Sequence, residues 1–431
     1  DPIPVLIHLV NVKEKSTLCH ETSFVLNPDI GEYDDPARQQ QCLLRLPLTQ
    51  EGNTIVYGVA GSGKTTFLNT MVYSLIQEHT PDEVHIYLLD FASETLRAFA
   101  KAPHVGDVIL SYESEKISNL FKMLQSELEN RKKLFADYGG DHASYLRATG
   151  EKMPSIVVGV NNFAAFTEMY EEKETAVSFL SREGTKYGIY FVLTALGTNA
   201  VRFRLLQNFK QMLVLQLNDE SDYASIVGKT DGLFPSRYKG RGLVKRDAIY
   251  EFQVAQITDE SVPFQFIQKE SVKLQSAWKG DIARKIPILP DQVDVEFLSE
   301  YVSEESLTIP IGVEKNSLNV HYYPFGKSYI HMILSSSTEH LGFTHDLAAF
   351  MANHGGFDVT VMDGQQSFIT KDNRHMTYYS TVKDFENTVH ALFELVLYRN
   401  NTYKEAIEKG VEAEPFDQKV IIINSVVALK N

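Results

Sequence analysis

Cysteine is scarce in this sequence of 431 residues. The only two, Cys19 and Cys42, do not form a C-x-x-C pair, so the sequence suggests neither a disulfide framework nor a zinc site and favours a reducing compartment. No apolar run approaches the ~18–20 residues needed to cross a bilayer, and no signal peptide is visible. Because the chain starts at Asp1 and stops just after an apolar run, we expect it to be a piece of a longer protein, whose other parts leave room for a membrane anchor.

Basic residues are also in short supply. Lys and Arg together number 41 against 56 for Asp and Glu, which gives a net charge of −15. A nucleic-acid-binding surface needs basic groups that replace the counterions of the phosphates, so no nucleic-acid partner is expected. Hydrophobic residues make up 43% and charged residues 23%, as in a globular protein, and the length allows two or three domains.

The sequence contains the same order of short segments twice. Each match is weak alone, but the spacing between matched residues shrinks steadily along the chain, as in a duplicated domain with small deletions in its second copy. A period of about 280 residues is too long for a solenoid repeat and indicates tandem domains. The matches are Ile3–Leu6 with Ile286–Leu289, Ile30–Gly31 with Ile311–Gly312, Thr54–Gly58 with His331–Ser335, Asp90 with Asp363, Arg131 with Arg399, and Asn161 with Asn424.

These matches predict three parts of the chain. Residues 1–262 form the first copy of the domain, residues 263–300 a connector, and residues 301–431 the second copy. The second copy ends near its Asn424 strand, so it is expected to be incomplete at its C-terminus.

Buried-strand patterns alternate with helix patterns in the first copy. The runs TIVYG, HIYLLD, SIVVGV, IYFVLTA and MLVLQL are continuously apolar, as in strands covered on both faces. FLNTMVYSLI places its apolar residues on one helical face, and ISNLFKMLQSELENRKKLF is a longer amphipathic helix that stops at Gly139–Gly140. This alternation predicts an α/β fold with a mainly parallel sheet flanked by helices.

A phosphate-binding loop (P-loop) follows the first of these strands. Residues 58–65, GVAGSGKT, fit G-x-x-x-x-G-K-[ST]. The glycines let backbone N–H groups turn toward phosphate oxygens, and the following helix adds its positive dipole end. Lys64 is expected to reach the β- and γ-phosphates of ATP, and the Thr65 hydroxyl to ligate Mg²⁺. The expected nucleotide-binding residues of the loop are Gly58, Val59, Ala60, Gly61, Ser62, Gly63, Lys64 and Thr65.

Hydrolysis by such sites depends on an Asp at the end of a second apolar strand, where it orients the Mg²⁺ shell. Here that strand ends in Asn161–Asn162, and an amide carries no charge and accepts no proton. Losing a preorganised charge costs on the order of 10²–10³ in rate. Two interpretations remain open: the site binds ATP-Mg²⁺ and turns it over slowly, or Asp90 on the next strand replaces the missing acid. Asp90, Asn161, Asn162 and Thr194 are all expected at the carboxyl edge of the sheet.

The second copy has lost the loop. The segment opposite it, Leu334–Phe350, contains no lysine and a single glycine, Gly342. Without inward N–H groups or an ammonium group it is not expected to hold a triphosphate. The second copy is therefore predicted to be a degenerate domain that keeps its fold for assembly or protein docking.

Several stretches together resemble the FtsK/SpoIIIE-type ATPases. They are DDPARQQQCLLRLPL, YGVAGSGKTTFLNTM, YLLDFASETLRAFAKAPHVGDVIL, ELENRKKLF, GIYFVLTA, and YKGRGLV followed by YEFQVA. The tandem arrangement most resembles the second and third of the three ATPase modules in the EssC/EccC family of type VII secretion. The resemblance implies two tandem RecA-like P-loop domains in a hexameric ring at the cytoplasmic side of the plasma membrane.

The resemblance also implies cofactors, partners and residue roles. ATP and Mg²⁺ are the implied cofactors, and the partners are other type VII secretion components and small helical-hairpin substrates whose C-terminal signal docks on one module. Thr66 joins the nucleotide-binding residues, and Thr194 falls where such ATPases keep a polar group that senses the γ-phosphate. The candidate catalytic residues are Lys64, Asn161, Asn162, Thr194 and Asp90. Ring ATPases usually insert an arginine from a neighbouring subunit, for which the candidates are Arg202, Arg204 and Arg241.

Two other functions stay open. One is a DNA-pumping translocase of the same superfamily, against which stand the negative charge, the degenerate second copy and the lack of a basic winged-helix tail. The other is a scaffold in which ATP is only a structural ligand. Because Asn161 stands where the family often has Asp, the sequence leaves open whether this chain is an enzyme.

Overall fold

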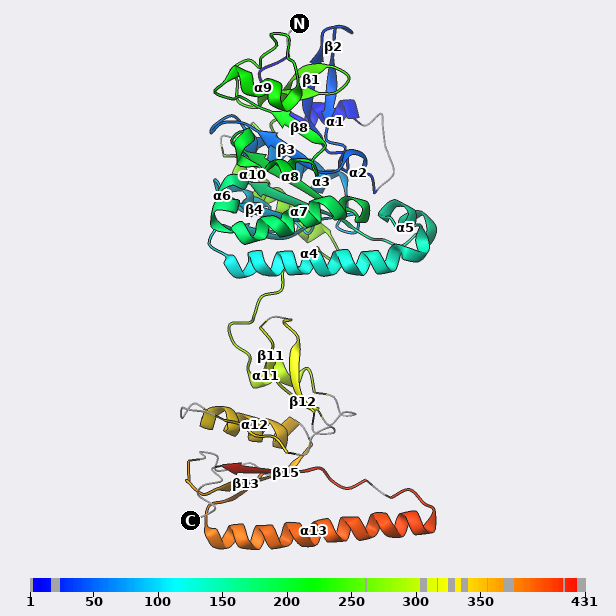
Figure 1. Ribbon diagram of the computed structural model, residues 1–431, viewed down its shortest axis with the longest axis vertical. Coiled ribbons are helices and arrows are strands. Elements are labelled where there is room, and N and C mark those ends of the chain that lie inside the picture. The colour runs from blue at the N-terminus through cyan, green and yellow to red at the C-terminus, as the bar shows by residue number, and fades with distance from the viewer. Residues whose placement is uncertain are drawn as a thin grey trace. The chain divides into compact units, whose positions relative to one another are not determined.

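The computed structural model describes residues 3–16, 24–259, 262–302, 308–315, 317–324, 330–334, 340–354, 356–367, 376–413 and 415–424. The chain forms two compact units, Asp1–Ile288 and Leu289–Asn431, each of which is described by itself (Figure 1). No helix among the described residues is long and apolar enough to cross a membrane.

One sheet organises the described part of the first unit. Its ten strands lie in the order β2-β1-β10-β9-β8-β3-β7-β6-β4-β5. The strands from β8 to β5 run parallel, which confirms the predicted α/β fold, and β9, β10, β1 and β2 extend the sheet with antiparallel pairs that were not predicted. The bounds are β1 Asp29–Asp35, β2 Gln40–Arg45, β3 Thr54–Tyr57, β4 Val84–Asp90, β5 Val105–Leu110, β6 Ser155–Asn161, β7 Ile189–Ala195, β8 Gln211–Val214, β9 Arg241–Lys245 and β10 Ile249–Val254.

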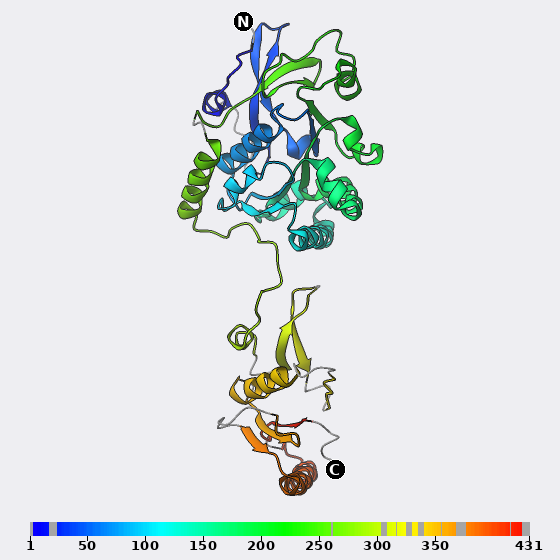
Figure 2. The same ribbon diagram turned by 90° about the vertical axis from the view of Figure 1, so that its left-hand side faces the viewer.

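Helices cover both faces of this sheet, as Figure 2 shows. Neighbouring side chains of a strand point to opposite faces, so Val56 joins one apolar core and Ile55 the other. The core of Val56 is closed by α3 (Lys64–Glu78), the 3-10 helix Thr95–Phe99 and α10 (Pro263–Ala277). The core of Ile55 is closed by α4 (Ser114–Phe135), α6 (Phe163–Met169), α7 (Glu174–Glu183) and α9 (Glu220–Val227). The smaller helices are α1 Leu9–Ser16, α2 Leu48–Glu51, α5 His142–Thr149 and α8 Phe203–Leu206.

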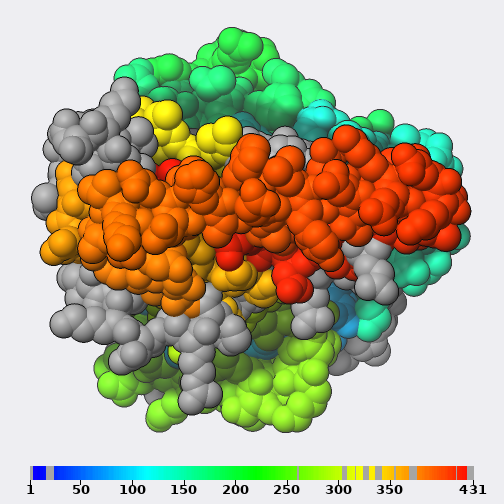
Figure 3. All heavy atoms as spheres, turned by 90° about the horizontal axis from the view of Figure 1, so that it is seen from below, coloured from blue at the N-terminus to red at the C-terminus, as the bar shows by residue number. Residues whose placement is uncertain are grey.

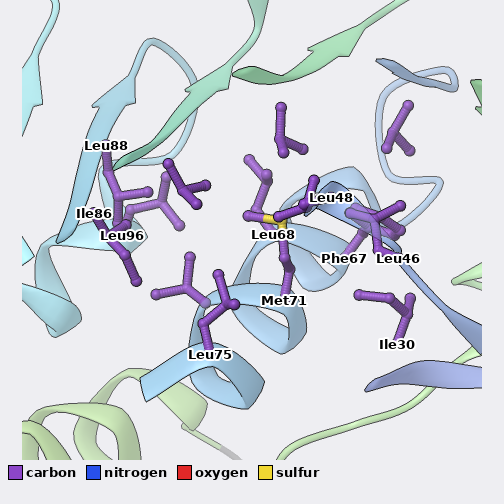
Figure 4. Close-up of a cluster of buried hydrophobic side chains, with 14 of the residues drawn as sticks. Ile30, Leu46, Leu48, Phe67, Leu68, Met71, Leu75, Ile86, Leu88 and Leu96 are labelled. Atoms are coloured by element: carbon purple, nitrogen blue, oxygen red, sulfur yellow. The ribbon is translucent and has the colours of Figure 1, made fainter. Parts of the chain in front are cut away.

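Helix α3 is held on the sheet by the apolar face that its sequence predicts. Phe67, Leu68, Met71 and Leu75 are fully buried and point into the core shown in Figure 4. Their neighbours in this core come from strands of the sheet and from the segments that directly follow those strands. These neighbours are Ile30, Leu46, Leu48, Ile86, Leu88 and Leu96. Burying a side chain of this size contributes about 1.5–3 kcal/mol, so this face fixes the helix that begins at the P-loop.

The segment expected as a connector packs, in its first part, against the first unit. Ile267 of α10 is buried in the core, and the Ser271 hydroxyl donates to the carbonyl of Ala98 at 3.2 Å. Further on, Tyr87 Oη donates to the carbonyl of Arg284 at 2.7 Å, and Ile286 is buried. The structure therefore groups residues 263–288 with the first unit, because this segment covers apolar surface of the sheet.

The second unit has fewer described elements. An antiparallel hairpin is formed by β11 (Thr308–Val313) and β12 (Val320–Pro324), and a parallel sheet has the order β14-β13-β15. The parallel strands are β13 Asp358–Asp363, β14 Met376–Tyr379 and β15 Lys419–Asn424, and the helices are α11 Val295–Ser299, α12 His340–His354 and α13 Val382–Lys409. In Figure 3, α13 forms a continuous orange ridge on the surface of this unit.

The two units repeat the same local arrangement. In the first unit Asp90 is paired with Asn161 in adjacent parallel strands, and in the second unit Asp363 is paired with Asn424 in the same way. The hairpins match too, since the register of each shifts by one residue just before Gly31 and Gly312. The matched pairs Asp90–Asp363, Asn161–Asn424 and Gly31–Gly312 therefore occupy equivalent structural positions.

One expected strand does not form in the described residues of the second unit. His331–Leu334, the described part of the match to Thr54–Gly58, has no strand structure. In the first unit, β3 is held between β7 and β8, which both follow β6 in the sequence. The last described strand of the second unit is β15, the counterpart of β6, so neither neighbour is present among the described residues. For the same reason Val389 and Val396 of α13 are exposed, whereas Phe121 and Leu128 at the matched positions of α4 are buried.

Candidate nucleotide-binding site

The candidate site lies where the parallel strands of the first unit end. The P-loop follows β3 directly, Asp90 and Asn161 are the last residues of β4 and β6, and Thr194 is the second-last residue of β7. Because β3, β7, β6 and β4 are successive neighbours in the parallel sheet, their carboxyl ends meet at one edge. The structure thus brings these predicted residues together.

The P-loop is anchored by its backbone to strands on both sides. Gly58 N donates to the carbonyl of Ala195 at 3.0 Å, and Val59 N donates to the carbonyl of Gln216 at 2.9 Å. Ala60 and Gly61 lie at the exposed lip of the loop, and Gly61 has a φ of 79°. Gly63, with a φ of 110°, starts α3, which includes Lys64, Thr65 and Thr66. Such left-handed φ values strain other residues, which explains the two glycines.

Lys64 is folded onto its own loop. Its Nζ donates to the carbonyl oxygens of Gly58 at 2.6 Å and of Val59 at 2.8 Å. Burial lowers the pKa of this ammonium group to about 8. Two neutral carbonyls compensate a buried charge poorly, so an anion beside Lys64 would raise this pKa again.

The P-loop is packed too closely to admit a side chain at Gly58 or Gly63. A Cβ added to Gly58 would lie 2.4 Å from Ser62 Oγ, and a Cβ added to Gly63 would lie 2.7 Å from the backbone N of Gly240. Ser62 Oγ is buried without a hydrogen-bond partner in the described structure. Backbone N–H groups at a helix start, an ammonium group and a Thr hydroxyl form the donor set that phosphates and Mg²⁺ require, so the residues present fit ATP-Mg²⁺.

Asn161 connects the P-loop to the neighbouring strands. Its Nδ2 donates to Asp90 Oδ1 at 3.0 Å and to Thr65 Oγ1 at 3.3 Å, and its Oδ1 accepts from Thr194 Oγ1 at 3.1 Å. Asn161 and Thr194 are buried, so this chain of polar contacts is shielded from solvent. The expected Mg²⁺ ligand, Thr65, therefore contacts an amide and not a carboxylate.

Asp90 is fully engaged in supporting the loop after β4. Its Oδ1 accepts from the backbone N–H groups of Ala92 at 3.2 Å and Ser93 at 3.3 Å as well as from Asn161. Its Oδ2 accepts from Leu96 N at 3.1 Å, and the side chain is 1% exposed. A carboxylate with these donors acts as a structural acceptor, which disfavours the interpretation that Asp90 replaces the missing acid.

Asn162 has a capping role. With a φ of 69° it precedes α6, and its Oδ1 accepts from Ala165 N at 3.4 Å. Its backbone N donates to Thr194 Oγ1 at 2.8 Å. Asn tolerates a left-handed φ and caps helices well. The position of Asn162 directly before an apolar helix is therefore a sequence signal for this capping role.

The three candidate arginines differ sharply in their surroundings. Arg202 is exposed and pairs with Glu171 at 2.9 Å and Glu174 at 3.2 Å of its own chain. Arg204 is exposed. Arg241 is 3% exposed and donates through Nη2 to the carbonyl oxygens of Ile3 at 3.1 Å and Pro4 at 2.9 Å. Arg241 therefore has a structural role, whereas Arg202 and Arg204 are exposed.

A segment that the sequence did not single out for the site lies against the P-loop. The strap, defined here as residues 236–240, precedes β9, and Gly240 N donates to the carbonyl of Ser62 at 2.8 Å. In the sequence, the glycine pair in YKGRG could have marked this segment. Gly240, the first of the pair, has a φ of 81° and no room for a Cβ.

The second unit keeps the strand-end cluster without the loop. Asn424 Nδ2 donates to Asp363 Oδ1 at 2.9 Å and to Ser367 Oγ at 2.8 Å, and Tyr378 Oη donates to Asp363 Oδ2 at 2.9 Å. Burial and the Asp363 carboxylate raise the pKa of Tyr378 to about 12. Gly342 lies within α12, while residues 335–339 of the segment opposite the P-loop are outside the described residues.

The sequence is similar to a known protein family and to known proteins. Residues 33–231 match the FtsK/SpoIIIE family. The ESX secretion system protein YukB of Bacillus subtilis (strain 168) is 29% identical over 408 residues, which is 91% of this chain and 27% of that protein. The type VII secretion system protein EssC of Staphylococcus aureus (strain MRSA252) is 24% identical over 412 residues, 92% of this chain and 27% of that protein. The chain thus spans about a quarter of the length of these relatives.

Solved structures share the fold. EssC (ATPases 2 and 3) from Geobacillus thermodenitrificans matches with a TM-score of 0.82 at 20% identity, covering 100% of this chain and 89% of that one. Thermomonospora curvata EccC (ATPases 2 and 3) in complex with a signal sequence peptide matches with a TM-score of 0.64 at 25% identity, covering 95% of this chain and 78% of that one. Residues 33–231 are thus similar to the FtsK/SpoIIIE family, and most of the chain is similar to YukB and EssC and shares the fold of ATPases 2 and 3 of EssC.

Proposed function

We propose that the first unit binds one ATP with Mg²⁺ at Gly58–Thr66, and that the second unit binds none. The observation that carries this proposal is the state of Lys64, a partly buried ammonium group that, among the described residues, is held by the carbonyls of its own loop. Lys64 and the backbone N–H groups at the start of α3 would hold the phosphates, and Thr65 would ligate Mg²⁺. The Mg²⁺ ion, when bound, neutralises charge on the β- and γ-phosphates.

Hydrolysis at this site is proposed to be slow. At the end of β6, Asn161 offers an amide where a carboxylate would orient the metal shell, and Asp90 is occupied by backbone and amide donors. Thr194 is proposed to respond to the γ-phosphate through its bond to Asn161. Lys64 holds the phosphates, while Asn162 supports this edge as the cap of α6.

The wider role is proposed from the relatives. The chain is proposed to be an ATP-binding part of a membrane-associated type VII secretion ATPase, hexameric in the full-length protein and located at the cytoplasmic side of the plasma membrane. Its substrates would be small helical-hairpin proteins carrying a C-terminal signal, and its partners other components of that system. The signal sequence peptide bound to the related EccC modules supports a docking role for one of the two units.

A calorimetric titration with ATP and Mg²⁺ tests the nucleotide proposal. We expect one site per chain, and we expect Lys64→Ala to lose it because the ammonium group is the main cation of the loop. Lys229→Ala is the matched control, since Lys229 pairs with Asp231 at 2.8 Å on an exposed loop. Two sites in the wild-type chain, or unchanged binding by Lys64→Ala, would contradict the proposal.

A further inference from the structure

The contacts of the P-loop differ on its two flanks. On one flank of β3, toward β7 and β6, Asn161 reaches Thr65 Oγ1 at 3.3 Å. Thr65 is the expected Mg²⁺ ligand, so the metal-bound phosphates of a nucleotide would lie on this flank. The other flank, toward β8 and β9, would then be left for the nucleoside end.

The strap, residues 236–240, stands on that other flank. Its Gly240 N donates to the carbonyl of Ser62 at 2.8 Å. A Cβ on Gly63 would lie 2.7 Å from Gly240 N and 3.5 Å from Lys239 Cγ. The strap thus touches the residue that immediately precedes Lys64, so it forms a wall beside the phosphate site.

Two glutamine side chains hold the strap rigid. Gln216 Nε2 donates to the carbonyl oxygens of Ser236 at 3.2 Å and Tyr238 at 2.9 Å. Gln253 Nε2 donates to the carbonyl of Lys239 at 2.9 Å. These carbonyl oxygens already accept hydrogen bonds, so the strap can offer a ligand mainly its side chains. Because the strap backbone is already held in place, binding would require little further ordering of it.

Tyr238 is the aromatic residue of the strap. The residue is 47% exposed, and the Arg241 guanidinium lies 5.6 Å from the ring centroid. Arg241 itself is fixed by Gln253 Oε1, to which its Nε donates at 2.9 Å. The ring is thus supported by a buried cation and still keeps an accessible part, as a stacking platform requires.

We propose that Tyr238 stacks on the base of the nucleotide bound at the P-loop, so that the strap is the nucleoside-binding wall of the site. This inference rests on the proposed ATP binding at Lys64. Stacking between an aromatic ring and a base tolerates any base, so Tyr238 would give affinity for a nucleotide over bare phosphates with little choice among bases.

Calorimetry with two ligands, ATP and inorganic tripolyphosphate, both with Mg²⁺, tests the proposal on the full chain. Tyr238→Ala should weaken ATP binding about tenfold or more and leave tripolyphosphate binding within about twofold. Tyr238→Trp should retain ATP binding because it keeps an aromatic face. Tyr112→Ala is the matched control, since Tyr112 is 67% exposed and follows β5 at the far end of the sheet.

The outcomes separate this inference from the proposed function. Unchanged ATP binding by Tyr238→Ala would overturn the stacking role. An equal loss for both ligands would also overturn it, because the strap would then only support the P-loop. If the wild-type chain bound ATP no better than Lys64→Ala does, the proposed nucleotide site itself would fail, whatever the Tyr238 variants did.

Discussion

Asn161 donates its side-chain amide to Asp90 at 3.0 Å at the place where the two parallel strands β6 and β4 end side by side. The same pair recurs in the second unit as Asn424 and Asp363 at 2.9 Å. An amide and a carboxylate can share this buried position because one donates and the other accepts, whereas two carboxylates would repel each other. The pair therefore stabilises the strand ends and keeps the Asp90 carboxylate engaged with hydrogen-bond donors.

Replacing Asn161 by Asp should make the first unit depend on its ligand. The variant places two carboxylates within hydrogen-bond distance in a site that is 1% exposed, so without nucleotide we expect a loss of about 2–4 kcal/mol in unfolding free energy. ATP-Mg²⁺ should recover most of it, because the cation compensates the added charge, and hydrolysis should rise. Thermal melting with and without ATP-Mg²⁺ checks this. Lys229→Ala is the control, because Lys229 pairs with Asp231 on an exposed loop.

Replacing Asp90 by Asn distinguishes a structural acceptor from a catalytic acid. The amide group of the variant places its own N–H donors opposite the backbone N–H groups of Ala92, Ser93 or Leu96, where no acceptor remains. We expect this to lower the free energy of unfolding by about 1–3 kcal/mol. Hydrogen exchange of the β4 and β6 amides in urea would measure this loss for the first unit alone. A variant of undiminished stability that had lost ATP hydrolysis would show that Asp90 is the missing acid after all.

The two left-handed glycines of the P-loop should differ in their tolerance of alanine. Gly63→Ala must displace the Gly240 backbone, whereas a Cβ on Gly61 meets open space. Both substitutions carry a conformational cost, so the difference isolates the steric term, about 1–3 kcal/mol. Urea-dependent exchange of α3 amides measures it. Equal losses in the two variants would mean that the strap yields without cost.

ATP binding should take up a proton in mildly alkaline solution. The Lys64 ammonium has a pKa of about 8 in the free loop, lowered by burial, and neighbouring phosphates would raise it. A pKa that is higher in the bound state means that affinity is undiminished below pH 8 and falls as the pH rises above it. Titrations at pH 8.5 in two buffers of different ionisation enthalpy count the proton. Lys64→Arg, which stays charged, should show neither the uptake nor the fall.

Local chemistry made part of this molecule predictable. The apolar runs, the face of Phe67, Leu68, Met71 and Leu75, and the glycine-rich loop depend on short-range periodicity and backbone freedom, so the sequence indicated the α/β fold and the P-loop. The order of matched segments also indicated the duplication, because equivalent strands end in equivalent residues. By contrast, the antiparallel extension of the sheet and the docking of residues 263–288 depend on apolar surfaces that no single segment reveals.

The sequence by itself determined the pattern of Gly58–Thr65 that predicts a phosphate-binding loop, because that pattern lies in adjacent residues. Only the tertiary structure decided the surroundings of Asp90, Arg241 and Tyr238. The fold surrounds Asp90 with hydrogen-bond donors and buries Arg241 against the N-terminal segment. The strap that contains Tyr238 lies beside the P-loop because the sheet places β8 and β9 beside β3, and such neighbours, distant in sequence, are chosen by packing of the whole sheet.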